Sequence, residues 1–236
     1  MPVNYLFNRN EVIVGEKIAL DGDIQKQIED TPNFRRASFK DVAYLGGKML
    51  TNILETCPLR RNTEHVFVDT KISMLMPGWL PGIPGWHTDG VPRDDRGGVR
   101  KGRPSMKLQE QLHTKGASPT FHLMLVGISN LTRFISEPLG VPLANGENRR
   151  LYNELTDFIE REFIPTANLD TAYVPYETQQ WLTWDWWNIH AATPAASRGW
   201  RMLVRVTESD VPPANKETEQ IVRKQTLVYV PTNYGW

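Results

Sequence analysis

The hydrophobic pattern of the chain indicates a β-rich protein. Stretches rich in β-branched and aromatic residues, with polar residues at alternate positions, are typical of strands with a buried face. In the stretch over 175–190, Trp residues occur on both faces, so either both faces are buried or one lies in the core and the other lines a pocket. The predicted strands cover residues 65–76, 121–128, 175–190 and 200–207, with shorter ones at 12–14, 131–135 and 226–230.

Apolar residues at helical spacing predict helices on either side of the first strands. One helix is expected over residues 39–55, where a capping box at its start is followed by a weak point at Gly46–Gly47. A second is expected over 147–163, which carries one apolar stripe and is followed by a proline. A helical turn is expected over 23–29. The chain is expected to form one domain over 1–236, with helical support at about 1–60 and a β core at about 65–230.

Two segments that are distant in the sequence carry candidate metal ligands. His87 and Asp89 are two residues apart, so in an extended segment both side chains point to the same face. His190 follows a run of tryptophans near the end of the third predicted strand. Two histidines and one carboxylate form the facial triad of non-haem Fe(II) oxygenases, which leaves the opposite coordination positions open. The sequence therefore predicts an iron site formed by these three residues.

Two arginines follow His190 at positions that share a face of the next predicted strand. Arg201 and Arg205 are four residues apart, so both guanidinium groups are expected to point the same way. A guanidinium group donates two parallel hydrogen bonds to a carboxylate, which makes arginine a natural receptor for an organic acid. A buried arginine is costly unless it is paired, so an anionic ligand or a protein carboxylate is the expected partner.

The ordered set of His87, Asp89, His190 and Arg201 resembles the Fe(II)/2-oxoglutarate-dependent dioxygenases, over roughly residues 69–207. The resemblance implies a mainly β fold with flanking helices, namely a double-stranded β-helix (a cupin-like jelly-roll). It also implies Fe(II), 2-oxoglutarate and O₂ as cofactor and cosubstrates, with decarboxylation to succinate and hydroxylation of an organic substrate. No catalytic residue beyond the metal ligands is expected.

By the same resemblance, Arg201 binds the distal carboxylate of 2-oxoglutarate. Arg205 either assists in that role, binds an acidic substrate or forms a structural ion pair. Arg198, which lies in the preceding turn, is a weaker candidate for the cosubstrate.

A polar, basic stretch over residues 92–119 contains a Gly-Gly pair and few apolar residues, so it is expected to be a long loop. The loop is either a solvated connection or, over 92–107, a lid that closes on the substrate. Arg93, Trp79 and Trp86 flank the predicted metal ligands and are candidate substrate contacts.

Composition and net charge bear on the class of partner and on the cellular compartment. Basic and acidic residues balance to a net charge of zero, which does not favour extended nucleic acid, although the basic loop and nearby tryptophans leave an oxygenase of nucleic acid or nucleotide bases as an alternative. A non-catalytic jelly-roll protein that binds a metal or ligand is a second alternative. The single cysteine predicts a reducing, cytoplasmic compartment. No apolar run is long enough for a membrane span, so no membrane partner is expected. A small-molecule substrate is the expected partner.

Overall fold

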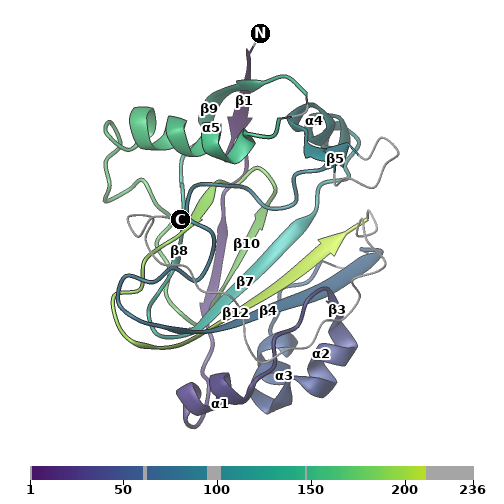
Figure 1. Cartoon of the computed structure of the whole chain (residues 1–236). Helices are drawn as coiled ribbons and strands as arrows, with labels where there is room; N and C mark the ends of the chain where they lie inside the picture. Colours follow the sequence, from purple (N-terminus) through teal and green to yellow (C-terminus); the bar gives the residue numbers. More distant parts are fainter. Residues whose placement is uncertain (1, 61–62, 95–101, 147, 211–236) are drawn as a thin grey trace.

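The computed structural model describes residues 2–60, 63–94, 102–146 and 148–210, and its centre is a six-stranded antiparallel sheet (Figure 1). The strand β12 lies near the middle, hydrogen-bonded to β7 on one side and to β4 on the other. In spatial order the strands are β2 (Ile13–Lys17), β10 (Gln180–Asp185), β7 (Thr120–Gly127), β12 (Gly199–Ser209), β4 (His65–Leu75) and β3 (Ala37–Ser38).

A short second layer lies against one face of this sheet. It consists of β8 (Thr132–Phe134) paired with β11 (His190–Ala192). The ring of Trp184 on β10 contacts the rings of Phe134 and His190, with centroids 5.1 and 5.8 Å apart. Side chains from both layers therefore interdigitate in one core, which also holds Leu123 and Leu125 from β7.

The opposite face of the large sheet is covered by three helices, α1 (Ile24–Asp30), α2 (Phe39–Leu45) and α3 (Gly47–Glu55), as Figure 1 shows. Met202, Val204 and Val206 of β12 are fully buried in the second core beneath these helices. Since side chains alternate along a strand, the residues at 201, 203 and 205 face the other layer.

The remaining elements gather at the end of the sheet far from α1, α2 and α3 (Figure 1). They are the two-stranded sheet of β1 (Pro2–Phe7) and β9 (Leu139–Ala144), the hairpin of β5 (Arg93–Asp94) and β6 (Arg103–Pro104), the helix α4 (Met106–Thr114), and the helix α5 (Leu151–Phe158) that continues as the π-helix η1 (Ile159–Phe163). No helix in the described ranges combines the length and apolar character needed to span a bilayer.

The prediction of a mainly β fold with flanking helices is confirmed. The predicted helix over 39–55 breaks at its expected weak point, because Gly47 has a φ of +81° and starts a new helix. The single strand predicted over 175–190 is wrong in part. Asp185 ends β10 by accepting a hydrogen bond from the backbone N–H of Trp187, and the chain turns before β11 begins at His190.

The loop predicted over residues 92–119 is also wrong in part, because it contains β6 and α4. Ser105 caps α4 by accepting a hydrogen bond from the backbone N–H of Leu108, and Met106 and Gln109 are buried. Residues 95–101, which form the middle part of the proposed lid, lie outside the described residues, as does the strand predicted over 226–230. The sheet of β1 and β9 was not predicted, and proline and glycine within β9 account for the weak pattern.

Candidate metal centre

A pair of backbone hydrogen bonds brings the two ligand segments together. The N–H of His87 donates to the carbonyl of His190 at 3.0 Å, and the N–H of His190 donates to the carbonyl of His87 at 2.9 Å. The two residues are thus opposite each other in an antiparallel bridge that extends the edge of β11. Their imidazole rings lie on the same side, with centroids 4.5 Å apart.

Asp89 completes the group. One ligand atom from each of His87, Asp89 and His190 lies within 4.8 Å of the other two, which is close enough for all three to hold one metal ion. The Nε2 of His190 is 3.6 Å from Oδ2 of Asp89. The predicted convergence of the three residues is therefore confirmed, and no other such group of His, Cys, Asp or Glu occurs in the described ranges.

Hydrogen bonds to the backbone orient both imidazole rings. Nδ1 of His190 is 3.1 Å from the carbonyl of Asn188, and Nδ1 of His87 is 3.3 Å from the carbonyl of Gly85. A carbonyl accepts only, so Nδ1 carries the proton in each ring. This tautomer leaves the Nε2 lone pairs free to bind a metal, which is the usual arrangement around metal-bound histidines.

The charge states of Asp89 and His190 also suit a metal ion. Burial acts to raise the pKa of Asp89, but Arg205 and the two histidines outweigh it and lower this pKa to about 2. Burial, reinforced by the nearby His87, lowers the pKa of His190 to about 4. At neutral pH the site therefore presents a carboxylate and a neutral imidazole, the protonation states that metal coordination requires.

The helix α5 fixes the loop that delivers His87. The hydroxyl of Thr156 accepts a hydrogen bond from the backbone N–H of Trp86 at 2.8 Å and lies 3.3 Å from the carbonyl of the same residue. Gly85 has a φ of +101°, a conformation that favours glycine. A Cβ atom at this position would lie 2.8 Å from the Thr156 hydroxyl, so the loop approaches α5 as closely as glycine allows.

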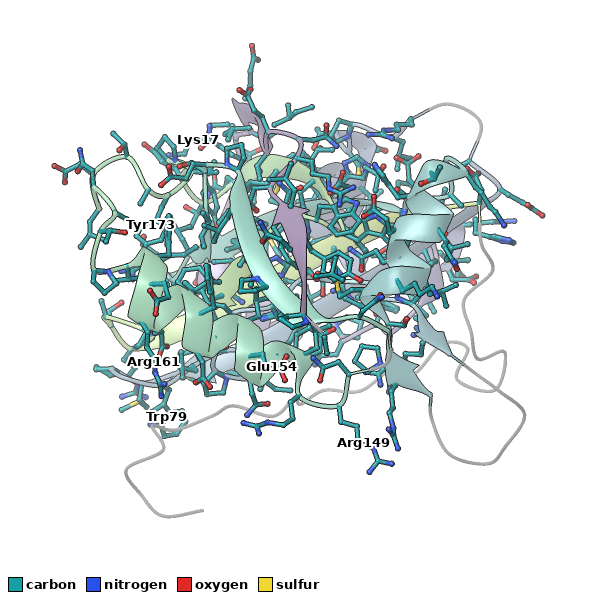
Figure 2. All side chains as sticks on the ribbon, turned by 90° about the horizontal axis from the view of Figure 1, so that it is seen from above. Lys17, Trp79, Arg149, Glu154, Arg161 and Tyr173 are labelled. Carbon is teal, nitrogen blue, oxygen red and sulfur yellow. The ribbon has the colours of Figure 1, made fainter. Side chains whose placement is uncertain are left out.

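The three candidate ligands line a cavity of about 810 Å³. Its inner wall is formed by Phe134, Trp184 and Leu203, and its outer wall by α5 and the loop over 81–86. Figure 2, seen from above, shows the helix with Glu154 and Arg161 lying across this end of the molecule. Tyr152 of α5 stands edge-on to the His87 ring, with centroids 6.3 Å apart.

Arg201 lines the same cavity and is only 2% exposed. Its Nε donates to the carbonyl of Asn130 at 2.9 Å, which directs the guanidinium group. No carboxylate of the described residues forms an ion pair with it, and burial lowers its pKa to about 10, still well above neutral. Arg201 is therefore a buried cation that faces a cavity, and its guanidinium group has further N–H donors available for a ligand.

Arg205 differs from Arg201 because its charge is already paired. Its Nη1 donates to Oδ2 of Asp89 at 2.9 Å, and its Nη2 donates to Oδ2 of Asp69 at 3.0 Å. Of the roles left open for Arg205, the ion pair is the one that the geometry supports, and a direct contact with 2-oxoglutarate stays a prediction. Asp69 was not predicted as part of the site, since strand register cannot be read from one strand alone.

The candidate substrate residues are placed differently from one another. Trp86 is buried and lines the cavity. Trp79 and Arg93 are not among the lining residues; the Trp79 side chain lies at the periphery of Figure 2, and Arg93 donates to the carbonyl of Gly102. Arg198 is exposed and also lies outside the lining. Substrate contacts by Trp79 and Arg93 stay predictions. Tyr152 and Thr156 reach the cavity although the sequence indicates only a helix there.

Comparison with models of protein families, with curated proteins and with solved structures finds no match for this chain.

Replacing His190 by Ala is expected to abolish stoichiometric metal binding, because two ligands hold a divalent ion far more weakly than three. The measurement is calorimetric titration of Mn(II) or Fe(II) into the protein without oxygen. His65→Ala is the matched control, since this histidine lies on β4 outside the lining of the cavity, and its side chain is paired with Glu64. Unchanged metal stoichiometry in the His190 variant would contradict the assignment.

Replacing Gly85 by Ala is expected to weaken metal binding by roughly tenfold, the lower end of effects seen when groups that support metal ligands are changed. The added Cβ would push the loop away from Thr156 and displace His87. Gly78→Ala is the control, because Gly78 also has positive φ, at +84°, but a Cβ there meets nothing within 4 Å. Equal losses in the two variants would show that strain at positive φ, and not the contact with α5, is responsible.

Proposed function

We propose that this protein is an Fe(II)- and 2-oxoglutarate-dependent oxygenase that hydroxylates a small organic substrate. One observation carries the proposal: a cavity contains both a His-Asp-His group and a buried arginine, Arg201, that forms no ion pair with a carboxylate of the described residues. Two imidazoles and one carboxylate suit Fe(II) and leave coordination positions open for other ligands. An arginine without a protein carboxylate, deep in the same cavity, suits an organic acid.

The arrangement of the strands supports a double-stranded β-helix as the specific type of this mainly β fold. A large antiparallel sheet faces a short layer that carries His190, and the ligands lie at the open end between them. Jelly-rolls of this kind enclose ligand sites between two sheets. The helices α1, α2 and α3 cover the outer face of the large sheet, and the cavity lies on its inner face.

The residues of the site have separate roles in this reaction. His87, Asp89 and His190 hold iron, which when bound supplies the oxygen activation that couples decarboxylation of 2-oxoglutarate to hydroxylation. Arg201 binds the far carboxylate of 2-oxoglutarate, and the carbonyl of Asn130 fixes the direction of its guanidinium group. The position of the cosubstrate is thereby set from β12, a central strand of the sheet. Binding of this kind orders the reactants before the chemical step.

The rest of the cavity suits an organic substrate. Trp86, Phe134 and Trp184 line the cavity with aromatic rings, which suit the apolar part of an organic substrate. Asp157 and Glu160 are exposed residues that line the outer part of the cavity, from α5 and η1. Carboxylates at this position repel phosphate groups, which favours a small-molecule substrate over nucleic acid.

Replacing Arg201 by Met is expected to weaken 2-oxoglutarate binding by about 2–4 kcal/mol, since a charge-assisted contact is lost and the ligand carboxylate is left unpaired. The measurement is calorimetric titration of 2-oxoglutarate into protein loaded with Mn(II) in place of iron. Methionine fills a similar length of the buried space without the charge.

Arg198→Met is the matched control, because it removes an exposed arginine from the turn before the same strand. Metal affinity is measured in both variants and is expected to be unchanged. Normal 2-oxoglutarate affinity in Arg201→Met would remove the basis for the cosubstrate assignment.

A further inference from the structure

Asp69 and Arg205 form a cross-strand pair next to the metal ligands. They are directly opposite each other in the register of β4 and β12, so their side chains rise from the same face of the sheet. The pair is joined by the Nη2–Oδ2 contact of 3.0 Å, and the same guanidinium group reaches Oδ2 of Asp89 through Nη1 at 2.9 Å. One cation is thus shared between a candidate metal ligand and a second carboxylate.

The carboxylate of Asp69 is itself held by a backbone hydrogen bond. Oδ1 of Asp69 accepts a hydrogen bond from the N–H of Arg36 at 3.0 Å. The Nε of Arg205 is buried and has no acceptor among the residues that the structure describes. The hydrogen bonds that hold the guanidinium group are therefore those to the two carboxylates.

The charges explain why a second carboxylate is needed. A cation this close to Asp89 repels a divalent metal ion bound to the same carboxylate, and the repulsion is strong in a poorly solvated site. Asp69 supplies a negative charge on the other side of the guanidinium group, so the Asp69–Arg205 pair is neutral overall. Arg205 can then fix the orientation of Asp89 without opposing the metal.

We propose that Asp69 is a positioning residue of the metal centre, which acts through Arg205 by cancelling its charge and holding it against Asp89. The proposal concerns how the chain binds a divalent ion; it rests on the metal site of the proposed function and not on the oxygenase reaction. In this role neither Asp69 nor Arg205 would be a metal ligand. Their influence is on the orientation and donor strength of the candidate ligand Asp89.

A double-mutant cycle in Mn(II) affinity tests this role without turnover or cosubstrate. Asp69→Asn keeps the size of the side chain and removes its charge. In the native background it is expected to weaken Mn(II) binding by roughly tenfold, a typical cost of disturbing a group behind a metal ligand. In an Arg205→Met background the same change is expected to alter the affinity by less than about twofold, because no cation remains to be cancelled.

Arg205→Gln is made in parallel as a second neutral background, so the cycle remains available if the Met variant does not fold. Glu177→Gln is the matched control: it also removes one carboxylate of an ion pair, with Lys17, but at an exposed site away from the cavity. Mn(II) affinity in this control is expected to stay within twofold of the native value. Circular dichroism and thermal unfolding confirm that each variant is folded.

An equal effect of Asp69→Asn in the native and neutral backgrounds would overturn the proposal, because Asp69 would then act independently of Arg205. An unchanged affinity in folded Asp69→Asn would overturn it as well. Absence of Mn(II) binding in the native protein is a different result, since it contradicts the metal centre itself.

Discussion

The site depends on two backbone hydrogen bonds between His87 and His190. Each residue donates to and accepts from the other, so the positions of both imidazole rings are set by main-chain geometry and not by long, adjustable side chains. Asp89 follows two residues later and joins the same face by the alternation of an extended chain. A pairing of this type is rigid because it fixes register as well as distance, and a shift of one residue would turn a ligand away from the metal. The hydrogen bond between Thr156 and Trp86 holds the loop in that register from outside.

The central strand β12 supplies the second organising constraint. Its alternate residues serve two different purposes: Met202, Val204 and Val206 pack beneath the helices, and Arg201 and Arg205 point into the cavity layer. Burying two arginines on one strand face is costly unless each has a separate partner. Arg205 has two protein carboxylates, whereas the hydrogen bond of Arg201 goes to the carbonyl of Asn130 and no carboxylate of the described residues pairs with it. The two arginines of this strand therefore differ. Arg205 supports the candidate metal ligand Asp89, whereas Arg201 is available to bind a small molecule in the cavity.

Short-range rules explain what the sequence could predict. The spacing of His87 and Asp89 and the alternation along 200–207 depend only on strand geometry, and both predictions are confirmed. Glycines at 46–47 marked a helix break for an equally local reason. The pairing of Asp69 with Arg205 depends on the register of two distant strands, and the role of Thr156 depends on where α5 packs. Neither has a local signal. The turn after Asp185 was missed because its capping carboxylate lies within an aromatic run that reads as continuous strand.

The most direct test is to measure succinate formed from 2-oxoglutarate by the purified protein, with Fe(II), in air and without oxygen. Release of succinate reports the oxidative decarboxylation itself and does not require the organic substrate to be known, since slow uncoupled turnover is expected in its absence. We expect succinate formation that requires both iron and oxygen and is lost in the His190→Ala variant. Succinate at the same background level in native protein and variant, with Fe(II) bound and the native protein folded, would contradict it.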